Sequence, residues 1–249
     1  MHTFLDPLTL TVALAAFLLA GFVKGVIGLG LPTVAMGLLS VAMAPVQAAA
    51  LLIVPSIVTN LWQLLAGPSF AALVGRLWPM LAGVLAGTLI GTGLMTGSSA
   101  RWAAAGLGLA LVIYAVIGLA SLRFTVPPAR EWWLSPLIGA ATGVVTAATG
   151  VFAIPAVPYL AALGLSKEDL IQALGLSFTV STVGLALART GGFHTAEVGA
   201  SLLAVLPALA GMAFGGWLRG RVSEAVFRRC FFLGLLGLGG HIAVHALSS

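Results

Sequence analysis

The sequence predicts an all-α polytopic membrane protein made of two inverted repeats, each a broken or re-entrant helical hairpin plus three spanning helices. The first observation is composition: 60% of the 249 residues are hydrophobic and only 7% are charged, and the mean hydropathy is +1.15. Such a chain has too few polar groups to cover a water-facing surface. Its apolar residues do not alternate as the strands of a membrane barrel would, so the spanning elements are predicted to be helices.

Breaks at glycine, proline and charged residues divide the chain into ten apolar segments. Six are long enough to cross about 30 Å of hydrocarbon as helix, namely 46–66, 72–95, 101–121, 168–189, 197–218 and 225–246. The other four form two pairs, 8–23 with 31–43 and 133–149 with 151–163. In each pair the second segment follows a Gly-rich break and is too short to span comfortably. Each pair is therefore predicted to form a bent or re-entrant hairpin.

The second observation is an internal repeat. Two glycine motifs occur twice, Pro79-x3-Gly83-x3-Gly87 as Pro207-x3-Gly211-x3-Gly215 and Gly21-x3-Gly25 as Gly139-x3-Gly143. The first offset also carries Arg101 onto Arg229. The predicted organisation is a first membrane repeat over 1–122, a cytoplasmic linker over 123–132 and a second membrane repeat over 133–249.

The third observation is the placement of the 11 Lys and Arg residues. If each hairpin returns to the side it entered, most of them share one face: Arg76, Arg123, Arg130, Lys167, Arg219, Arg221, Arg228 and Arg229. Only Arg101 and Arg189 fall on the other face. Cytoplasmic loops accumulate Lys and Arg, so both termini are predicted to be periplasmic in a bacterial inner membrane. An odd number of crossings per half makes the repeat inverted, an architecture of transporters whose substrate binds at the midplane.

The residues that could carry chemistry begin with the first break, from Gly21 to Pro32, where glycines interrupt an apolar helix beside Lys24. A lysine at membrane depth costs about 2.5–3.5 kcal/mol, which favours a cavity or a partner, with snorkelling to the interface as the alternative. Gly25, Gly28 and Gly30 permit unusual backbone angles, and Pro32 suits the first turn of a new helix. The exposed N-terminus of that helix would attract an anion. Close helix packing is the alternative role of the glycines.

The second half offers a matching break in which Thr142 stands where Lys24 stands. Its threonine hydroxyls could bind anion oxygens or could bond their own preceding turn. Two amide side chains inside a span, Asn60 and Gln63, either line the route or join helices. The predicted substrate site comprises Lys24, Gly25, Gly28, Gly30, Asn60, Gln63, Thr142, Thr146, Thr149 and Gly150.

Several function classes are not expected. All six acids fall in loops or at segment ends, namely Asp6, Glu131, Glu168, Asp169, Glu197 and Glu224, so a proton that drives transport would ride on the substrate or on Lys24. The four histidines, His2, His194, His241 and His245, lack ligand spacing, and neither a metal nor a cofactor is expected. No Ser-His or His-Glu spacing inside a span suggests an enzyme. Basic residues are scattered singly, unlike those of a nucleic-acid surface. An anion channel of the same architecture remains the alternative to a secondary carrier.

At these motifs the chain resembles a known family. The run Gly-Phe-x-Lys-Gly-x-x-Gly-x-Gly at 21–30, the Thr149-Gly150 pair with the following Pro155, and two halves of this length look like the TauE/SafE sulfite exporter family of membrane transporters. The resemblance covers nearly the whole chain. It implies an inner-membrane protein that moves sulfite, sulfonates or related sulfur-containing anions. One departure is that the second break reads Thr-Gly-Val-Phe at 149–152, where family members often carry additional glycines.

The resemblance and the residues together predict the partners of the chain. They are a small anionic substrate and the lipid bilayer, with a homodimer left open and with no nucleic acid.

Overall fold

The computed structural model describes residues 7–91, 100–120, 125–188, 195–219, 221 and 223–248, and this part of the chain is helical apart from its turns and connections. In chain order the helices are α1 (Pro7–Ile27), α2 (Leu31–Ala42), α3 (Pro45–Leu65), α4 (Phe70–Ile90), α5 (Ala100–Ala120), α6 (Pro128–Thr149), α7 (Ala156–Ala162), α8 (Lys167–Leu187), α9 (Thr195–Leu218) and α10 (Glu224–Ser248). Each of the ten predicted segments corresponds to one helix. Five residues used in the sequence argument lie outside the described residues, namely His2, Asp6, Arg123, Arg189 and His194.

Three helix ends differ from the expectation. Helix α1 continues through Lys24 and Gly25 to Ile27, because glycine inside an apolar helix here serves packing and does not end the helix. Helix α6 begins at Pro128, inside the stretch expected to be linker, because proline is accepted in the first turn. Helix α7 has only 7 residues, since the chain from 151 to 155 is not helical.

The described helices identify a multi-pass membrane protein. Seven of them, α1, α3, α4, α5, α8, α9 and α10, are long and apolar enough to cross a membrane. Helix α2, with 12 residues, is only about 18 Å long and α7 is shorter still, so neither can cross about 30 Å of hydrocarbon. The exposed surface is rich in large apolar side chains, and all six tryptophans are exposed: Trp62, Trp78, Trp102, Trp132, Trp133 and Trp217. Exposed indole rings are typical of proteins that contact the membrane interface.

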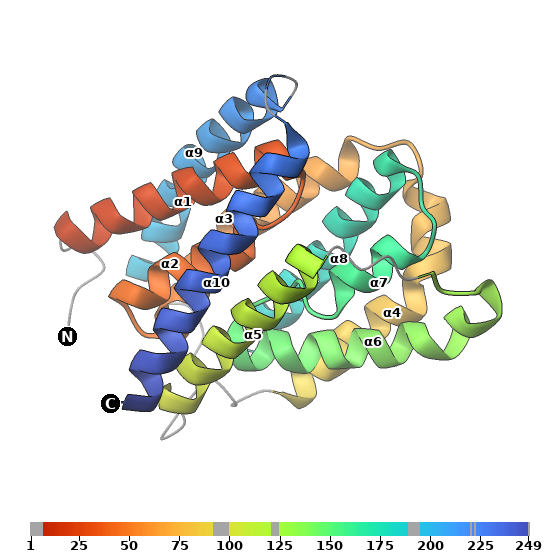
Figure 1. Ribbon diagram of the computed structural model, residues 1–249, viewed down its shortest axis with the longest axis horizontal. Helices are drawn as coiled ribbons and strands as arrows, with labels where there is room; N and C mark the ends of the chain where they lie inside the picture. The colour runs from red at the N-terminus through yellow and green to blue at the C-terminus, as the bar shows by residue number, and fades with distance from the viewer. Residues whose placement is uncertain are drawn as a thin grey trace.

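The first hairpin turns back on itself (Figure 1). The last turn of α1 lies beside the C-terminal part of α3, since Lys24 bonds Asn60 and Gly28 bonds Gln63. Helix α2 therefore runs from this level back toward the side on which α1 begins, and α3 crosses again. In Figure 1, α1 begins and α10 ends on the same side of the molecule. This path agrees with the assumption behind the predicted topology that each hairpin returns to the side it entered.

The repeated glycine motifs pack against each other between the two halves. Gly21 and Gly25 of α1 lie against the α9 backbone near Gly211 and Gly215, so closely that added Cβ atoms would come within 3.0 Å of main-chain atoms. The second half repeats this contact with the partners exchanged. Helix α6 brings Gly139-x3-Gly143 against Gly83-x3-Gly87 of α4, again backbone to backbone. Small residues at both positions are what allow such close crossings in membrane helices.

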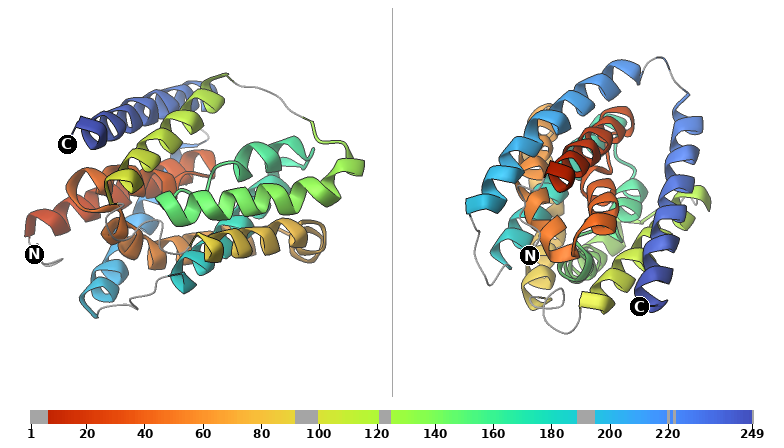
Figure 2. Two further views of the ribbon diagram at one scale, coloured as in Figure 1. Left: turned by 90° about the horizontal axis from the view of Figure 1, so that it is seen from below. Right: turned by 90° about the vertical axis from the view of Figure 1, so that its left-hand side faces the viewer.

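Helices that are equivalent in the two halves run antiparallel where they meet. Arg101 at the start of α5 donates hydrogen bonds to the carbonyls of Ala246 and Leu247 at the end of α10, at 2.8 and 2.6 Å. Figure 2 shows this α5–α10 pair along one flank of the molecule. At the α3–α8 contact, Gln172 near the start of α8 donates to Leu64 near the end of α3, at 2.8 Å. Antiparallel equivalents are the arrangement that inverted halves would produce, although the inversion itself stays a prediction.

Candidate functional site

Lys24 lies in the last turn of α1 and is buried, with 2% of its surface exposed. Its Nζ donates to Thr59 Oγ1 at 3.3 Å and to Asn60 Oδ1, both on α3. The side chain therefore does not snorkel to the membrane interface. Both acceptors are neutral oxygens, so the ammonium charge has hydrogen bonds but no counter-charge in these contacts.

The acidic residues in the described part of the chain lie at helix starts. Glu131, Glu168, Asp169 and Glu197 are in the first turns of α6, α8 and α9, and Glu224 is the first residue of α10. Glu131 forms an ion pair with Arg76 at 2.6 Å, between the starts of α6 and α4. Glu131, Glu168, Asp169 and Glu197 are not among the hydrogen-bond partners of Lys24, which are Thr59 and Asn60.

The break after α1 has the backbone geometry that its glycines predict. Gly28 and Gly30 have φ values of 81° and 104°, in the left-handed region where a side chain is unfavourable. Gly30 is the N-cap of α2, and Pro32 lies in the first turn of that helix, as expected. Gln63 Nε2 donates to the Gly28 carbonyl at 2.6 Å and so attaches α3 to the break.

One face of α3 presents the polar groups around Lys24. Ser56, Thr59, Asn60 and Gln63 follow helical spacing and are all buried. Asn60 Nδ2, Gln63 Oε1 and the Ser56 hydroxyl have no hydrogen-bond partner among the described residues. Buried polar atoms normally find partners, and unpaired ones indicate an unseen ligand or water. Asn60 Nδ2 and the Ser56 hydroxyl are donors, which an anion could use together with Lys24.

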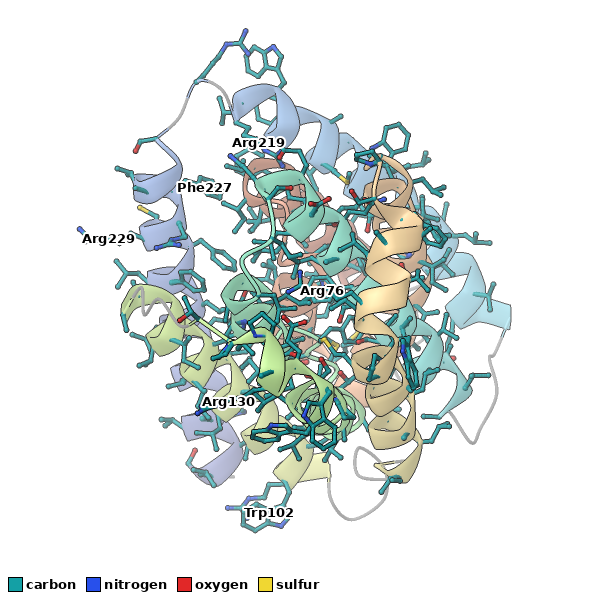
Figure 3. All side chains as sticks on the ribbon, turned by 90° about the vertical axis from the view of Figure 1, so that its right-hand side faces the viewer. Arg76, Trp102, Arg130, Arg219, Phe227 and Arg229 are labelled. Carbon is teal, nitrogen blue, oxygen red and sulfur yellow. The ribbon has the colours of Figure 1, made fainter. Side chains whose placement is uncertain are left out.

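Gly25 is not part of this cluster. It lies inside α1 at the crossing with α9, against the Met212 carbonyl. The Gly25 carbonyl accepts hydrogen bonds from Arg219 Nη2 at 2.7 Å and from Nε at 3.1 Å, and the Val26 carbonyl accepts from Nε at 2.9 Å. Arg219, labelled in Figure 3, thus caps the C-terminus of α1 next to the break.

The threonines of the second break bond their own chain. Thr142 and Thr149 donate to carbonyls four residues earlier in α6, at 2.8 and 2.7 Å. Thr146 donates to the Val151 carbonyl at 3.4 Å. Their hydroxyl hydrogens are therefore engaged, and none of the hydrogen bonds of the described residues joins them to Lys24 or Asn60. Thr142 and Thr149 thus bond their own preceding turn, one of the two roles that the sequence left open, and anion binding by the three threonines stays a prediction.

The two hairpins meet where Gly150 lies against Met36 of α2. Gly150 has a φ of 69° and closes the C-terminus of α6. Its N–H donates to the Thr146 carbonyl at 2.8 Å, and the Gly28 N–H donates to the Lys24 carbonyl at the same distance. These two predicted amide donors are therefore engaged in ending their helices. In the described first break, the amides of Leu29 and Gly30 donate to no backbone carbonyl.

The structure thus brings together Lys24, Gly28, Asn60 and Gln63 of the predicted set, with Gly30 next to them in the break. It adds three residues that the prediction did not include, Ser56, Thr59 and Arg219. The spacing of Ser56 and Thr59 relative to Asn60 could have placed them on the same helix face. Nothing in the sequence links Arg219 to the end of α1, because that contact depends on how α1 crosses α9.

Comparison with protein families gives one finding about identity. The family described as sulfite exporter TauE/SafE matches residues 13–242 of the chain. Neither the search of curated proteins nor the search of solved structures gave a match. The matched range contains both glycine breaks, the Lys24 cluster and all four glycine motifs. The chain therefore belongs to the sulfite exporter TauE/SafE family of membrane transporters.

Proposed function

We propose that the protein is a secondary carrier of sulfite, sulfonates or related sulfur-containing oxyanions across the bacterial inner membrane. The observation that carries the proposal is Lys24, an ammonium that is buried at the end of α1 and bonded only to neutral oxygens. Burying a charge without a counter-charge is costly. An anionic substrate would supply the missing charge while it is bound.

The substrate would be held by a small set of donors. Lys24 provides the charge, and the unpaired Asn60 Nδ2 and Ser56 hydroxyl provide directed hydrogen bonds. The Leu29 and Gly30 amides at the start of α2 lie in the adjoining break, where the helix dipole also favours negative charge. A tetrahedral or pyramidal oxyanion, with several acceptor oxygens in different directions, matches donors of this kind.

Alternating access would follow from movement of one half against the other. The contacts between the halves include the glycine crossings, at which the backbones of α1 and α9 and of α4 and α6 pack closely. Rocking at these contacts would expose the Lys24 cluster to one side of the membrane and then to the other. Saturable exchange in proteoliposomes would favour this carrier mechanism, whereas continuous conduction in single-channel recordings would indicate an anion channel.

Replacing Lys24 by Met tests the site because it removes the charge and keeps an unbranched apolar side chain. Hydrogen bonds to charged groups contribute about 1.5–3 kcal/mol, so anion affinity should fall roughly 10- to 100-fold. The measurement is flux of sulfite, short alkyl sulfonates, thiosulfate and sulfate in proteoliposomes. The variant should be at least as stable to heat as the parent protein, because an uncompensated buried charge is removed.

The matched control for this experiment is Arg229→Gln, which removes an exposed positive charge at the start of α10. It should leave anion affinity within about twofold, because exposed charges are screened by solvent and salt. Unchanged flux of every anion in Lys24→Met would refute the assignment of the site.

A further inference from the structure

A large cavity lies on the side of the molecule where α8 and α10 begin. Its volume is about 710 Å³, and its walls come from the end of α1, the C-terminal part of α5, helix α7 and the starts of α8 and α10. Both halves of the protein and both hairpins therefore contribute to it. A second hollow lies nearby and is lined by Arg229 and Cys230. It shares only Gly118 and Arg228 with the lining of the large cavity.

The charged residues of this wall are all basic. Lys167 at the start of α8 and Arg228 at the start of α10 both line the cavity and are exposed, and its lining among the described residues includes no carboxylate. Tyr114 of α5 also lines it, and the buried Tyr114 hydroxyl has no hydrogen-bond partner among the described residues. Two cations on one wall, beside a hydroxyl with no partner among the described residues, suit an anionic occupant.

The cavity adjoins the first break, next to the Lys24 cluster, because the lining residue Ile171 lies 3.5 Å from where a Cβ added to Gly28 would stand. Leu29, in the first break, and Leu174 of α8 line it. The residue after Leu174, Gly175, packs against the α3 backbone at Asn60 and Gln63, within 3.3 Å for an added Cβ. Leu29 and Leu174 are thus apolar lining residues that are chain neighbours of Gly28 and Gly175, which pack beside the Lys24 cluster.

We propose that this cavity is the vestibule by which the oxyanion reaches the Lys24 cluster from the arginine-rich face of the protein. Lys167 and Arg228 raise the local concentration of anions, and Leu29 and Leu174 form the apolar closure between vestibule and site. The proposal rests on the proposed function for the identity of the anion. Its central claim, a positive potential inside the cavity that is set by these two side chains, is independent of transport.

Thiol chemistry measures this potential directly. In a Cys230→Ser background, cysteine is introduced at the exposed Ala161 or at the half-buried Ile171, which lies beside Gly28; both line the cavity. Each is reacted in detergent with an anionic sulfonatoethyl and a cationic trimethylammonioethyl methanethiosulfonate. The ratio of the two rates should favour the anionic reagent and should fall about tenfold at low ionic strength in Lys167→Gln/Arg228→Gln.

The matched control is Arg221→Gln/Arg229→Gln, which removes two positive charges from the same end of the protein but outside the lining of this cavity. It should change the ratio by less than about twofold, because exposed charges outside the cavity are screened. Arg229 projects away from the bundle (Figure 3). A ratio that responds equally to both double variants, or to neither, would overturn the vestibule.

Transport then separates the vestibule from the site. Lys167→Gln/Arg228→Gln should raise the KM for sulfite several-fold at low salt and leave the maximal rate close to that of the parent protein. If Lys24→Met leaves transport unchanged while the thiol ratio still depends on Lys167 and Arg228, the proposed binding site fails and the vestibule stands. If the thiol ratio is insensitive to both cations, the vestibule fails whatever Lys24→Met does.

Discussion

At the scale of single residues, the buried amide side chains of α3 and α8 differ in how fully they are bonded. Gln172 makes three hydrogen bonds: Nε2 donates to the Leu64 and Gly67 carbonyls, both at 2.8 Å, and Oε1 accepts from the Ser69 N–H at 2.9 Å. Gln63 makes one, to Gly28, and its Oε1 is unpaired. Full bonding is typical of a structural residue, and partial bonding leaves capacity for a ligand or water.

Replacing each glutamine by Leu should separate these two roles. Gln172→Leu leaves two carbonyls and one N–H at the end of α3 without partners, so we expect about 2–4 kcal/mol of destabilisation. Gln63→Leu removes one hydrogen bond and should cost only about 1 kcal/mol. Unfolding in mixed detergent micelles measures the difference. Sulfite flux should fall in Gln63→Leu, because the break loses its attachment to α3. Equal destabilisation by the two variants would contradict this distinction.

At the scale of elements, the glycine motifs determine how closely the halves approach. Gly215 of α9 faces α1, where an added Cβ would come within 3.0 Å of the Phe22 carbonyl oxygen. The next residue, Gly216, has no atom within 4 Å of an added Cβ. The two glycines are neighbours in one helix. They differ in whether a side chain added at that position would meet α1.

Alanine at these two positions should therefore have opposite effects. Gly215→Ala forces α1 and α9 apart, and we expect at least about 1–3 kcal/mol of destabilisation from overpacking. Gly216→Ala should be neutral or should stabilise by up to about 1 kcal/mol, since alanine is the better helix former. Thermal unfolding in detergent provides the comparison. A neutral Gly215→Ala would mean that the α1–α9 crossing is looser than its geometry indicates.

The helices were predictable to different degrees. Uninterrupted apolar runs predicted α3, α5, α8, α9 and α10 closely, because length and hydropathy alone determine a spanning helix. The end of α1 was placed too early. A glycine such as Gly25 reads as a helix break in sequence, whereas in a membrane helix it often marks a backbone crossing, and only the position of α9 decides between the two.

The predictable residues of the candidate site are those whose role follows from their position in the sequence. Lys24 and the glycines at 28 and 30 stand out as a charge and two conformational exceptions in an apolar run, and the structure places them together. The threonines of α6 were ambiguous because a hydroxyl inside a helix can bond its preceding turn, as Thr142 does. The sequence could not show which residues of α3 bond Lys24, because that depends on how α1 packs against α3.

At the scale of the whole molecule, charge and antiparallel pairing support the predicted topology. The described Arg and Lys residues other than Lys24 and Arg101 lie where α4, α6, α8 and α10 begin or where α9 ends. Arg101 lies at the opposite end of the α5–α10 pair from Arg229, its repeat equivalent. If the crowded end is cytoplasmic, as the positive-inside rule predicts, equivalent positions of the two halves face opposite sides of the membrane.

The single native cysteine allows this topology to be tested without a fusion partner. Cys230 is exposed near the start of α10, at the crowded end, and Trp102 is exposed near the start of α5, at the other end. A membrane-impermeant maleimide should label Cys230 in inside-out vesicles and leave it unlabelled in right-side-out vesicles. In a Cys230→Ser background, Trp102→Cys should show the reverse pattern, because inverted halves place the two helix starts on opposite surfaces.

Labelling of both positions from the same surface would be incompatible with an inverted repeat, since antiparallel α5 and α10 could then not both cross the bilayer. Labelling of each from the surface opposite to that expected would keep the inversion and reverse the orientation, so that the vestibule lined by Lys167 and Arg228 would open to the periplasm.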